Sequence, residues 1–290
     1  MIKTAIHPRY GLKLEGIDLA QVSAETGYPK IRTAFEQHSF LYFPNQDLDD
    51  AAHLRLGALF GPREDRSLSP DKPLPKVSMV SNRKQGDSLY KKGDSRLLEL
   101  QANMLWHTDS TFLPIPALAN ILIARVIPRS GTSSEFVSTR AAWEDMPVEL
   151  KNKARDRYLI HDYTFSRRKI DPKLAEQQKF THWGQQIWKS IWTNPENGKE
   201  ALYIASHACA IVGKEQEEGL KLINELINWC TQEQYIYKHH WKDGDVLIWD
   251  ERAMLHRGVP WNYEEERSLS SICISVTSKD GLDEMRYPHK

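Results

Sequence analysis

Three residues that can bind a metal stand in two short segments far apart in the chain. His107 and Asp109 lie two positions apart within Leu105–Phe112, and His256 ends the segment Trp249–His256. On an extended strand, side chains two positions apart leave the same face. Two imidazoles and one carboxylate are the facial ligand set of non-haem Fe(II), which leaves coordination positions open for substrate, cosubstrate and dioxygen. If the two segments converge, this ligand set indicates an oxidation site.

Zinc is the main competitor of iron for these donors. Two histidines and a carboxylate also hold Zn²⁺ with an activated water, which would make the chain a hydrolase. A histidine and an aspartate two positions apart often occur by chance, so the pair alone does not decide between the metals. On the residue types alone, both metals remain open.

The metal-binding segments must be positioned by the strands and helices around them. Hydrophobic periodicity and turn residues predict several of each. The predicted strands are Ser39–Phe43, Met104–His107, Ala119–Ile127, Glu135–Ser138, Ala201–Ala205, Tyr235–Trp241, Asp245–Trp249 and Ser268–Thr277. The predicted helices are Tyr28–Gln37, Asp49–Phe60, one beginning near Arg140 with Thr139 as its cap, and Glu215–Thr231. This pattern indicates a mainly β fold with peripheral helices, such as a jelly roll.

Two segments lack a clear period. Residues 81–98 are charged and contain two glycines, so we expect a mobile surface loop. Residues 162–197 begin with basic side chains and continue with tryptophans, and we expect an irregular insert. No repeat or linker divides the chain. One domain over residues 1–290, with both segments beside the active site, is the simplest interpretation.

The composition excludes several classes of protein. With 40% hydrophobic residues the chain can bury a substantial core, and 39 basic against 39 acidic residues indicate no nucleic-acid or anionic-membrane partner. No apolar run approaches the roughly 20 residues of a membrane span. The three cysteines are widely spaced, which argues against a disulfide framework. The first residues also lack the apolar core of a secretory signal, so we expect a cytoplasmic protein.

Longer stretches around the three residues resemble a known family. Gln101–Pro116 is similar to the metal motif of the taurine dioxygenase/2,4-dichlorophenoxyacetate dioxygenase family, and Trp241–Gly258 resembles its distal-histidine motif. Arg267 follows His256 by 11 positions, where the family carries the arginine that grips 2-oxoglutarate. The resemblance continues in Phe43–Gln46, Phe60–Pro62, Pro128–Gly131 with Glu135-Phe136, and Asn197–Lys199 with Leu202-Tyr203. Similar blocks in the same order extend from about residue 10 to residue 277.

The resemblance implies a fold and a set of site residues. The family folds as a double-stranded β-helix, or jelly roll, with Fe(II) near one mouth. It implies that His107, Asp109 and His256 hold the iron and that Arg267 meets the far carboxylate of 2-oxoglutarate, to which a guanidinium can pair bidentately. Asn103 falls where the family places an amide near the metal-bound end of the keto acid. Ser134 stands in place of a threonine that touches the cosubstrate.

The resemblance also implies a reaction. Fe(II), 2-oxoglutarate and dioxygen would together oxidise a C–H bond of a small organic substrate, with release of succinate and CO2. Halogenating relatives replace the metal-binding carboxylate with a small residue. Asp109 therefore indicates hydroxylation, desaturation or ring closure. Relatives commonly self-associate, so a homo-oligomer is an open expectation.

One position departs from the family pattern. Relatives that act on sulfonates or aryloxy acids carry a second arginine 15 positions after the distal histidine, and here that position is Ser271. Serine cannot form a bidentate charged clamp, so we expect taurine and phenoxyacetates to be poor substrates. Other candidate anchors for an acid group are Lys91, Lys92, Arg96, Arg167 and Arg168. Tyr90, Trp183, Trp188 and Trp192 are candidates either to line an apolar pocket or to pack under a lid.

Two other functions compete with the oxygenase. A zinc hydrolase would use the same ligands but would leave Arg267 without a role. A jelly-roll binding protein with an inactive metal site would retain the fold alone. Oxygen uptake that depends on 2-oxoglutarate separates the first two, and failure to bind iron would favour the third. The sequence does not identify the substrate.

Overall fold

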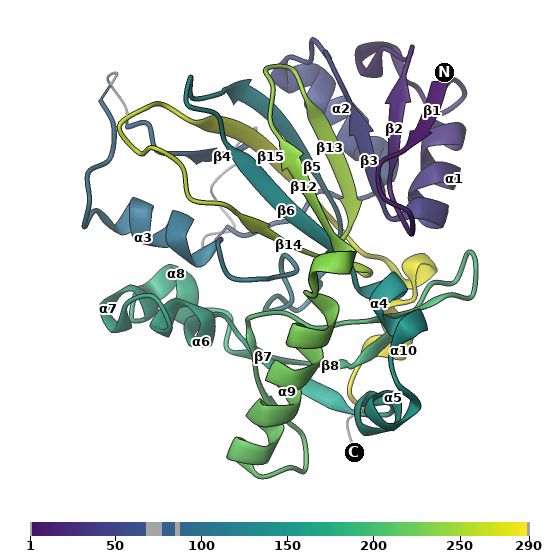
Figure 1. Ribbon diagram of the computed structural model, residues 1–290, viewed down its shortest axis with the longest axis vertical. Helices are drawn as coiled ribbons and strands as arrows, with labels where there is room; N and C mark the ends of the chain where they lie inside the picture. Colours follow the sequence, from purple (N-terminus) through teal and green to yellow (C-terminus); the bar gives the residue numbers. More distant parts are fainter. Residues whose placement is uncertain (1, 68–76, 85–87, 289–290) are drawn as a thin grey trace.

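Two β-sheets face each other and form the upper part of the molecule in Figure 1. The computed structural model describes residues 2–67, 77–84 and 88–288. The larger sheet has seven strands in the order β1-β2-β3-β13-β5-β15-β4, and the smaller has three in the order β12-β6-β14. From β5 onwards the chain passes back and forth between the sheets, because β5, β13 and β15 belong to one and β6, β12 and β14 to the other. This arrangement is the expected double-stranded β-helix.

The bounds of these strands are β1 Ile2–Ala5, β2 Leu12–Glu15, β3 Phe40–Phe43, β4 Ser78–Ser81, β5 Ala117–Val126, β6 Ser133–Ser138, β12 Ile236–His240, β13 Val246–Asp250, β14 Met254–Gly258 and β15 Ser268–Ser275. Five further strands of the described chain lie outside the two sheets: β7 Tyr158–Asp162, β8 Gln185–Lys189, β9 Ile191–Thr193, β10 Glu200–Leu202 and β11 Ala208–Ile211. Within both main sheets, neighbouring strands are antiparallel except for β2 and β3.

Helices surround this framework. They are α1 Tyr28–His38, α2 Asp50–Phe60, α3 Ser95–Ala102, α4 Thr139–Asp145, α5 Val148–Ala154, α6 Tyr163–Arg168, α7 Pro172–Ala175, α8 Gln178–Thr181, α9 Gln216–Cys230 and α10 Leu282–Met285. Short 3-10 turns occupy Leu19–Gln21, Glu233–Tyr235 and Ser278–Asp280. Among the described residues, each helix is too short or too polar to cross a membrane.

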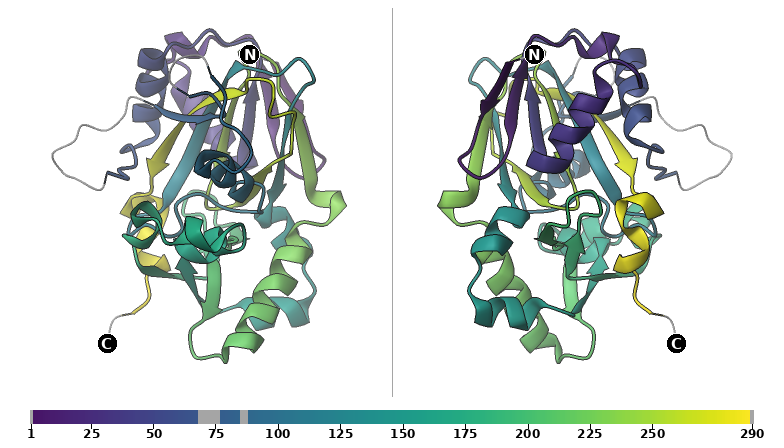
Figure 2. Two further views of the ribbon diagram at one scale, coloured as in Figure 1. Left: turned by 90° about the vertical axis from the view of Figure 1, so that its left-hand side faces the viewer. Right: turned by 90° about the vertical axis from the view of Figure 1, so that its right-hand side faces the viewer.

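Alternating side chains on β13 show how the larger sheet separates two hydrophobic cores. Val246 and Ile248 face outwards and pack with residues of α1 and α2, which cover that face of the sheet in Figure 2. Leu247 and Trp249 face the opposite way, into the space between the two sheets. Because successive side chains of a strand point to opposite faces of the sheet, one continuous run of apolar residues contributes to both cores. The space between the sheets is where the metal-binding residues lie.

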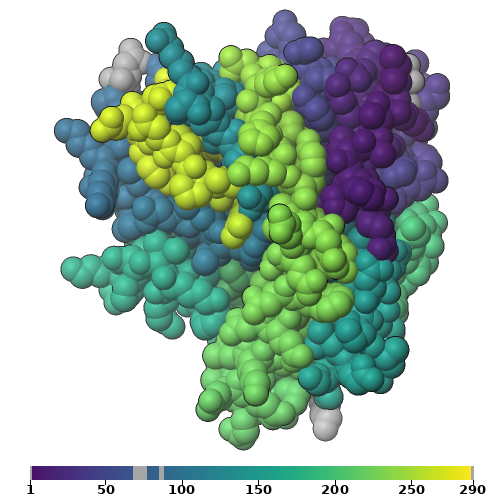
Figure 3. All heavy atoms as spheres, viewed as in Figure 1, coloured from purple at the N-terminus to yellow at the C-terminus, as the bar shows by residue number. Residues whose placement is uncertain are grey.

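The lower half of the molecule in Figure 1 rests on a third hydrophobic cluster. Residues of α4, α5 and α9 pack there with β7, β10 and β11 and with the outer face of the smaller sheet. The N-terminal segment lies beside the chain that leaves α9, as the purple and light-green surfaces of Figure 3 show. Nε2 of His7 is 3.0 Å from the carbonyl oxygen of Gln234 at that contact. Segments distant in sequence therefore support both ends of the barrel.

Most predicted helices and strands are confirmed to within a few residues. Asp49 caps α2 by accepting a hydrogen bond from the backbone N–H of Ala52, whereas Ser138, not Thr139, caps α4. The strand predicted at Met104–His107 is wrong. After α3 the backbone turns through hydrogen bonds from Met104 N to Gln101 O and from Leu105 N to Ala102 O. Strand β14, which carries His256, was not predicted.

The two segments expected to be irregular contain regular structure. Residues 85–87 of the expected loop lie outside the described residues, and the remainder includes a bridge between Arg83 and Leu89 and the first residues of α3. The segment 162–197 contains α6, α7, α8, β8 and β9. Asp162 and Asp171 begin two of these helices by accepting hydrogen bonds from the backbone N–H groups of Thr164 and Leu174. These caps are the signal that the periodicity analysis missed, because the helices are too short to show a period.

A buried histidine on β7 makes the stability of the fold sensitive to acid. His161 is fully buried, and neither ring nitrogen has a hydrogen-bond partner. Burial lowers the pKa of His161 to about 3 from the ordinary 6.5. Since the unfolded chain binds a proton near pH 6.5 and the folded one does not, stability present above pH 6.5 is lost as the pH falls towards 3.

We expect His161→Leu to flatten this pH dependence. Between pH 6.5 and pH 5, His161 alone should cost the native protein about 2 kcal/mol of unfolding free energy, and the variant should escape that loss. Urea unfolding at the two pH values measures the difference. His240→Leu, at an exposed histidine, is the matched control, and its unfolding free energy should change with pH as that of the native protein does. Equal slopes in the native protein and His161→Leu would contradict this assignment.

Candidate metal centre

Two backbone hydrogen bonds join the metal-binding segments. The backbone N–H of His107 donates to the carbonyl of His256 at 3.0 Å, and that of His256 donates to the carbonyl of His107 at 2.8 Å. The two residues thus form a single antiparallel β-bridge, although no strand surrounds His107. The Thr108 hydroxyl adds a further link by donating to the carbonyl of Met254 at 2.9 Å. The bridge holds the early segment against β14.

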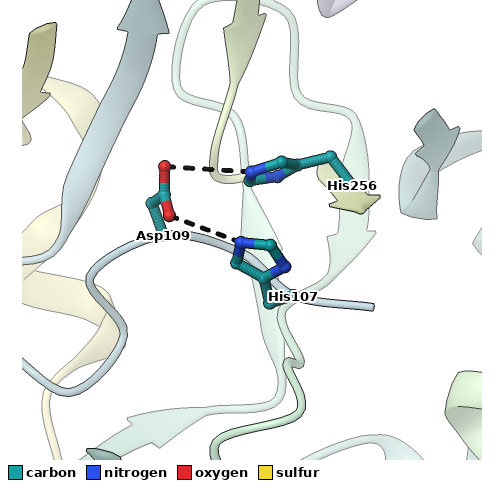
Figure 4. A group of neighbouring side chains, drawn as sticks. All are labelled: His107, Asp109 and His256. Atoms are coloured by element: carbon teal, nitrogen blue, oxygen red, sulfur yellow. Dashed lines mark ion pairs between the residues drawn. The ribbon is translucent and has the colours of Figure 1, made fainter. Parts of the chain in front are cut away.

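The three predicted ligands meet in the space between the sheets, as Figure 4 shows. Nε2 of His107 lies 3.7 Å from Oδ1 of Asp109, and Nε2 of His256 lies 3.9 Å from Oδ2. One ligand atom from each residue lies within 4.8 Å of the other two. The chain turns immediately after Asp109 because Ser110 adopts a φ of 63°. The turn leaves the carboxylate directed at both imidazoles.

Burial keeps the two imidazoles in the neutral form that binds metal. It lowers the pKa of His256 to about 3 and also lowers the pKa of His107. Nδ1 of His107 lies 2.7 Å from the carbonyl of Leu105, so it carries the proton and leaves the lone pair on Nε2. Burial alone would raise the pKa of Asp109, but the two imidazoles and the Arg66 guanidinium hold it below its ordinary value. All three side chains therefore present the protonation states that metal coordination requires.

Neighbouring polar groups fix the carboxylate. The Asn120 amide donates to Oδ2 of Asp109 at 2.7 Å, and the Ser271 hydroxyl donates to the amide oxygen of Asn120 at 2.9 Å. Glu251 accepts a hydrogen bond from the backbone N–H of Asp109 at 2.9 Å. Burial, reinforced by the charge of Asp109, raises the pKa of Glu251 well above its ordinary value. Ser271 therefore belongs to a chain of hydrogen bonds that orients a metal ligand.

A cavity of about 410 Å³ opens at the triad. Arg267, Ser134 and Asn103 line it, as the resemblance implies. The Arg267 guanidinium is buried, donates from Nε to the Thr132 hydroxyl at 3.1 Å, and lies 4.8 Å above the Trp261 ring. No ion pair joins it to a carboxylate within the described part of the chain. A cation without a counter-ion thus faces the same cavity as the metal ligands.

The structure separates the other candidate substrate residues into two groups. Arg96, Arg167 and Ser271 line the cavity. Tyr90, Lys91, Lys92, Arg168, Trp183, Trp188 and Trp192 are absent from its described lining. Trp188 and Trp192 are buried in the core instead, where their indole N–H groups donate to the carbonyls of Thr111 and Asp280. Lys91 and Lys92 are exposed to solvent.

Several cavity residues were not singled out from the sequence. They are Glu64, Arg66, Phe112, Asn120, Tyr163 and Cys273. Asn120 had a usable signal, because it is the only polar residue in the apolar run Ala117–Ala124. His207 also lines the cavity, with its ring 6.4 Å from that of His107.

Comparison with known proteins agrees with this geometry. Residues 4–273 match the family described as "Taurine catabolism dioxygenase TauD, TfdA family". The chain belongs to this family. It is 28% identical over 268 residues to the (S)-phenoxypropionate/alpha-ketoglutarate-dioxygenase of Sphingobium herbicidovorans, covering 90% of each chain. It is 28% identical over 276 residues to the alpha-ketoglutarate-dependent 2,4-dichlorophenoxyacetate dioxygenase of Cupriavidus pinatubonensis, covering 93% of this chain and 96% of the relative.

A solved structure supports the same assignment. AAD-2 in complex with Mn(II) and N-oxalylglycine superimposes with a TM-score of 0.89 at 26% identity, over 95% of this chain and 98% of the other. This TauD/TfdA-family member is therefore a 2-oxoglutarate-dependent non-haem iron dioxygenase, with Fe(II), 2-oxoglutarate and dioxygen as its cofactor and cosubstrates. Its two neutral imidazoles and its carboxylate fit Fe(II), because they match the facial donor set of that metal.

We expect Asn120→Ala to weaken metal binding by this dioxygenase. Hydrogen bonds that orient a metal ligand commonly contribute about 10–100-fold to affinity, and Asn120 donates directly to Asp109. Anaerobic titration with Mn(II) should show a dissociation constant raised by about tenfold or more. Ser271→Ala removes only the bond that orients Asn120 and should have a smaller effect. Native affinity in Asn120→Ala would contradict this role.

Proposed function

We propose that this dioxygenase oxidises a C–H bond of a small organic substrate, by hydroxylation, desaturation or ring closure, and releases succinate and CO2. The observation that carries the proposal is the pairing of the metal triad with Arg267 in one cavity. When bound, Fe(II) activates dioxygen at the expense of 2-oxoglutarate and supplies the oxidising power for the C–H bond. The intact carboxylate of Asp109 supports oxygenation and argues against halogenation.

Arg267 is suited to hold the far carboxylate of 2-oxoglutarate. Burial lowers its pKa to about 10, and the guanidinium therefore remains charged at neutral pH. Thr132 and the Trp261 ring hold its plane in place. Because the described chain offers it no carboxylate, a diacid would supply the missing counter-ion. A zinc hydrolase would leave this buried charge uncompensated.

Ser134 and Asn103 are the proposed partners at the other polar atoms of the keto acid. The Ser134 hydroxyl oxygen accepts a hydrogen bond from the Trp241 indole at 3.0 Å, which leaves its own hydrogen free to donate into the cavity. Asn103 ends α3, and its backbone carbonyl accepts from Gly258 at 2.9 Å, which ties it to β14. These contacts support the proposed role of both residues as uncharged partners of the keto acid.

Asp109→Ala and Arg267→Gln test the proposal together. Asp109→Ala should reduce 2-oxoglutarate-dependent succinate formation by about 100-fold or more, since it removes a metal ligand. Arg267→Gln should raise the KM for 2-oxoglutarate about tenfold or more, because it removes a charge-assisted bidentate pair. Mass spectrometry of succinate and an oxygen electrode provide the measurements, with the exposed Arg129→Gln as the control.

Two results would reject the oxygenase. One is an unchanged rate of succinate formation in Asp109→Ala. The other is activity of the zinc-loaded protein as a hydrolase with no oxygen uptake, which would favour the zinc alternative. An inactive binding protein would bind no iron under anaerobic conditions.

The chemistry at Ser271 yields a prediction about substrates. A buried serine whose hydroxyl already bonds Asn120 cannot clamp an anion from β15. We therefore expect taurine, a sulfonate without an apolar body, to stimulate succinate formation little above the rate without substrate. Rapid, coupled turnover of taurine would contradict this expectation. Cytoplasmic location and self-association stay predictions.

A further inference from the structure

We propose that Arg167 forms a second anion-binding site in the cavity and anchors the acid group of a substrate that has a flat apolar body. The inference rests on the proposed function and adds the residue that anchors the substrate. It moves the anionic anchor from β15, where Ser271 stands, to α6 on another wall of the cavity, so Ser271 by itself does not exclude aryloxy acids. Figure 1 shows α6 beside α7 and α8, at the side of the two sheets and below α3.

Arg167 is buried without a counter-ion. Its exposed fraction is 6%, although it lines the cavity. Nη1 donates to the Ser166 hydroxyl at 3.2 Å and Nη2 to the Tyr163 hydroxyl at 3.1 Å, so both of these partners are neutral. Nε has no partner, and no ion pair links the residue to a carboxylate in the described ranges. Enclosing a charge in this way costs several kcal/mol unless an anion neutralises it.

The other guanidiniums in the cavity lining differ from Arg167. Arg66 is paired with Glu64, Arg96 with Glu99, and Arg257 with Glu135. Arg267 shares the lack of an acidic partner, but it is the residue proposed to receive 2-oxoglutarate. Arg63 has an interaction of its own. Arg167 is therefore the cation best placed to receive a second anion.

Aromatic rings lead from Arg167 towards the metal ligands. The guanidinium lies 4.4 Å from the centroid of the Tyr163 ring, and Tyr163 stacks on Phe112 with centroids 3.5 Å apart. His207 meets Tyr163 edge-on at 5.4 Å and lies 6.4 Å from the His107 ring. Such a wall suits a flat apolar body, with its acid group at Arg167 and its reacting carbon nearer the triad.

A purely structural role would leave the charge of Arg167 unexplained. The guanidinium also lies 5.4 Å from the Phe180 ring, so two aromatic rings fix its plane. Stacking of this kind stabilises a cation but does not neutralise it. It does hold the guanidinium in one orientation, which lowers the entropic cost of pairing with an oxyanion. The rings therefore prepare the residue for an anion.

The test compares acids with their neutral amides as probes. The full chain, loaded with Mn(II) and saturating 2-oxoglutarate without oxygen, is titrated calorimetrically with three matched pairs. These are benzoate and benzamide, phenylacetate and phenylacetamide, and benzenesulfonate and benzenesulfonamide. We expect at least one acid to bind the native protein about tenfold or more tightly than its amide, the scale of a charge-assisted pair. Arg167→Gln should abolish that preference.

Three further variants make the result specific. Arg168→Gln replaces the neighbouring exposed arginine on the same helix and should keep the native preference. Arg167→Lys keeps the charge without the planar fork, should reduce the preference only in part, and replaces Arg167→Gln if the latter loses its native circular dichroism. Repeating the titration in Arg267→Gln excludes binding of the probes at the cosubstrate arginine. No preference for any acid in the native protein, or an undiminished preference in Arg167→Gln, would overturn the proposal.

The two proposals can fail separately. Calorimetry detects the anion site without turnover, whereas succinate formation by the native enzyme tests the oxygenase. An Arg167-dependent preference for acids without succinate formation would retain the anion site and reject the proposed reaction. Succinate formation without any preference for acids would retain the proposed reaction and reject the anion site.

Discussion

The reciprocal hydrogen bonds between the backbones of His107 and His256 are the constraint on which the site depends. His107 follows an irregular turn rather than a strand, so its position is set by its partner on β14. Pairing of β14 with β6 in turn fixes His256 opposite Phe136, facing the space between the sheets. The whole β framework therefore determines where the three donor atoms meet, and a slip of one residue would turn His256 away.

Charge is distributed unevenly around those donors. The Asp109 carboxylate accepts a hydrogen bond from the Asn120 amide, and the backbone N–H of Asp109 donates to Glu251. Three arginines that line the cavity are paired with glutamates. Arg167 and Arg267 are the exceptions, because they are buried cations with neutral partners in the described chain. A folded protein keeps such groups at a cost in stability, and that cost is offset when anionic ligands bind. This arrangement fits the two proposed acids, 2-oxoglutarate and the substrate, beside the metal.

Local sequence accounted for much of the framework and for the choice of the three candidate metal ligands, which the structure brings together. The strands β5, β13 and β15 and the start of α2 are encoded by adjacent residues, and they were predicted to within a few positions. The motifs around His107 and His256 identified the family, because a motif is recognised from residue types and their order alone. Arg267 faces the cavity at the position that its spacing from His256 implied.

Features that depend on tertiary pairing could not be read in the same way. Whether Arg167 or Arg168 faces the cavity depends on how the short helix α6 packs, and neither residue has a local signal. Trp188 and Trp192 lie in the core because β8 and β9 bring them there, whereas the sequence suggested a pocket wall or packing under a lid. The prediction of a strand at Met104–His107 was wrong, because His107 forms a single β-bridge with His256 instead of a row of strand hydrogen bonds.

Anomalous diffraction at the iron absorption edge, from crystals grown without oxygen in the presence of Fe(II), tests the central claim most directly. The account predicts one iron peak, coordinated by Nε2 of His107, Nε2 of His256 and a carboxylate oxygen of Asp109. An iron peak elsewhere, or none between these three side chains, would contradict it.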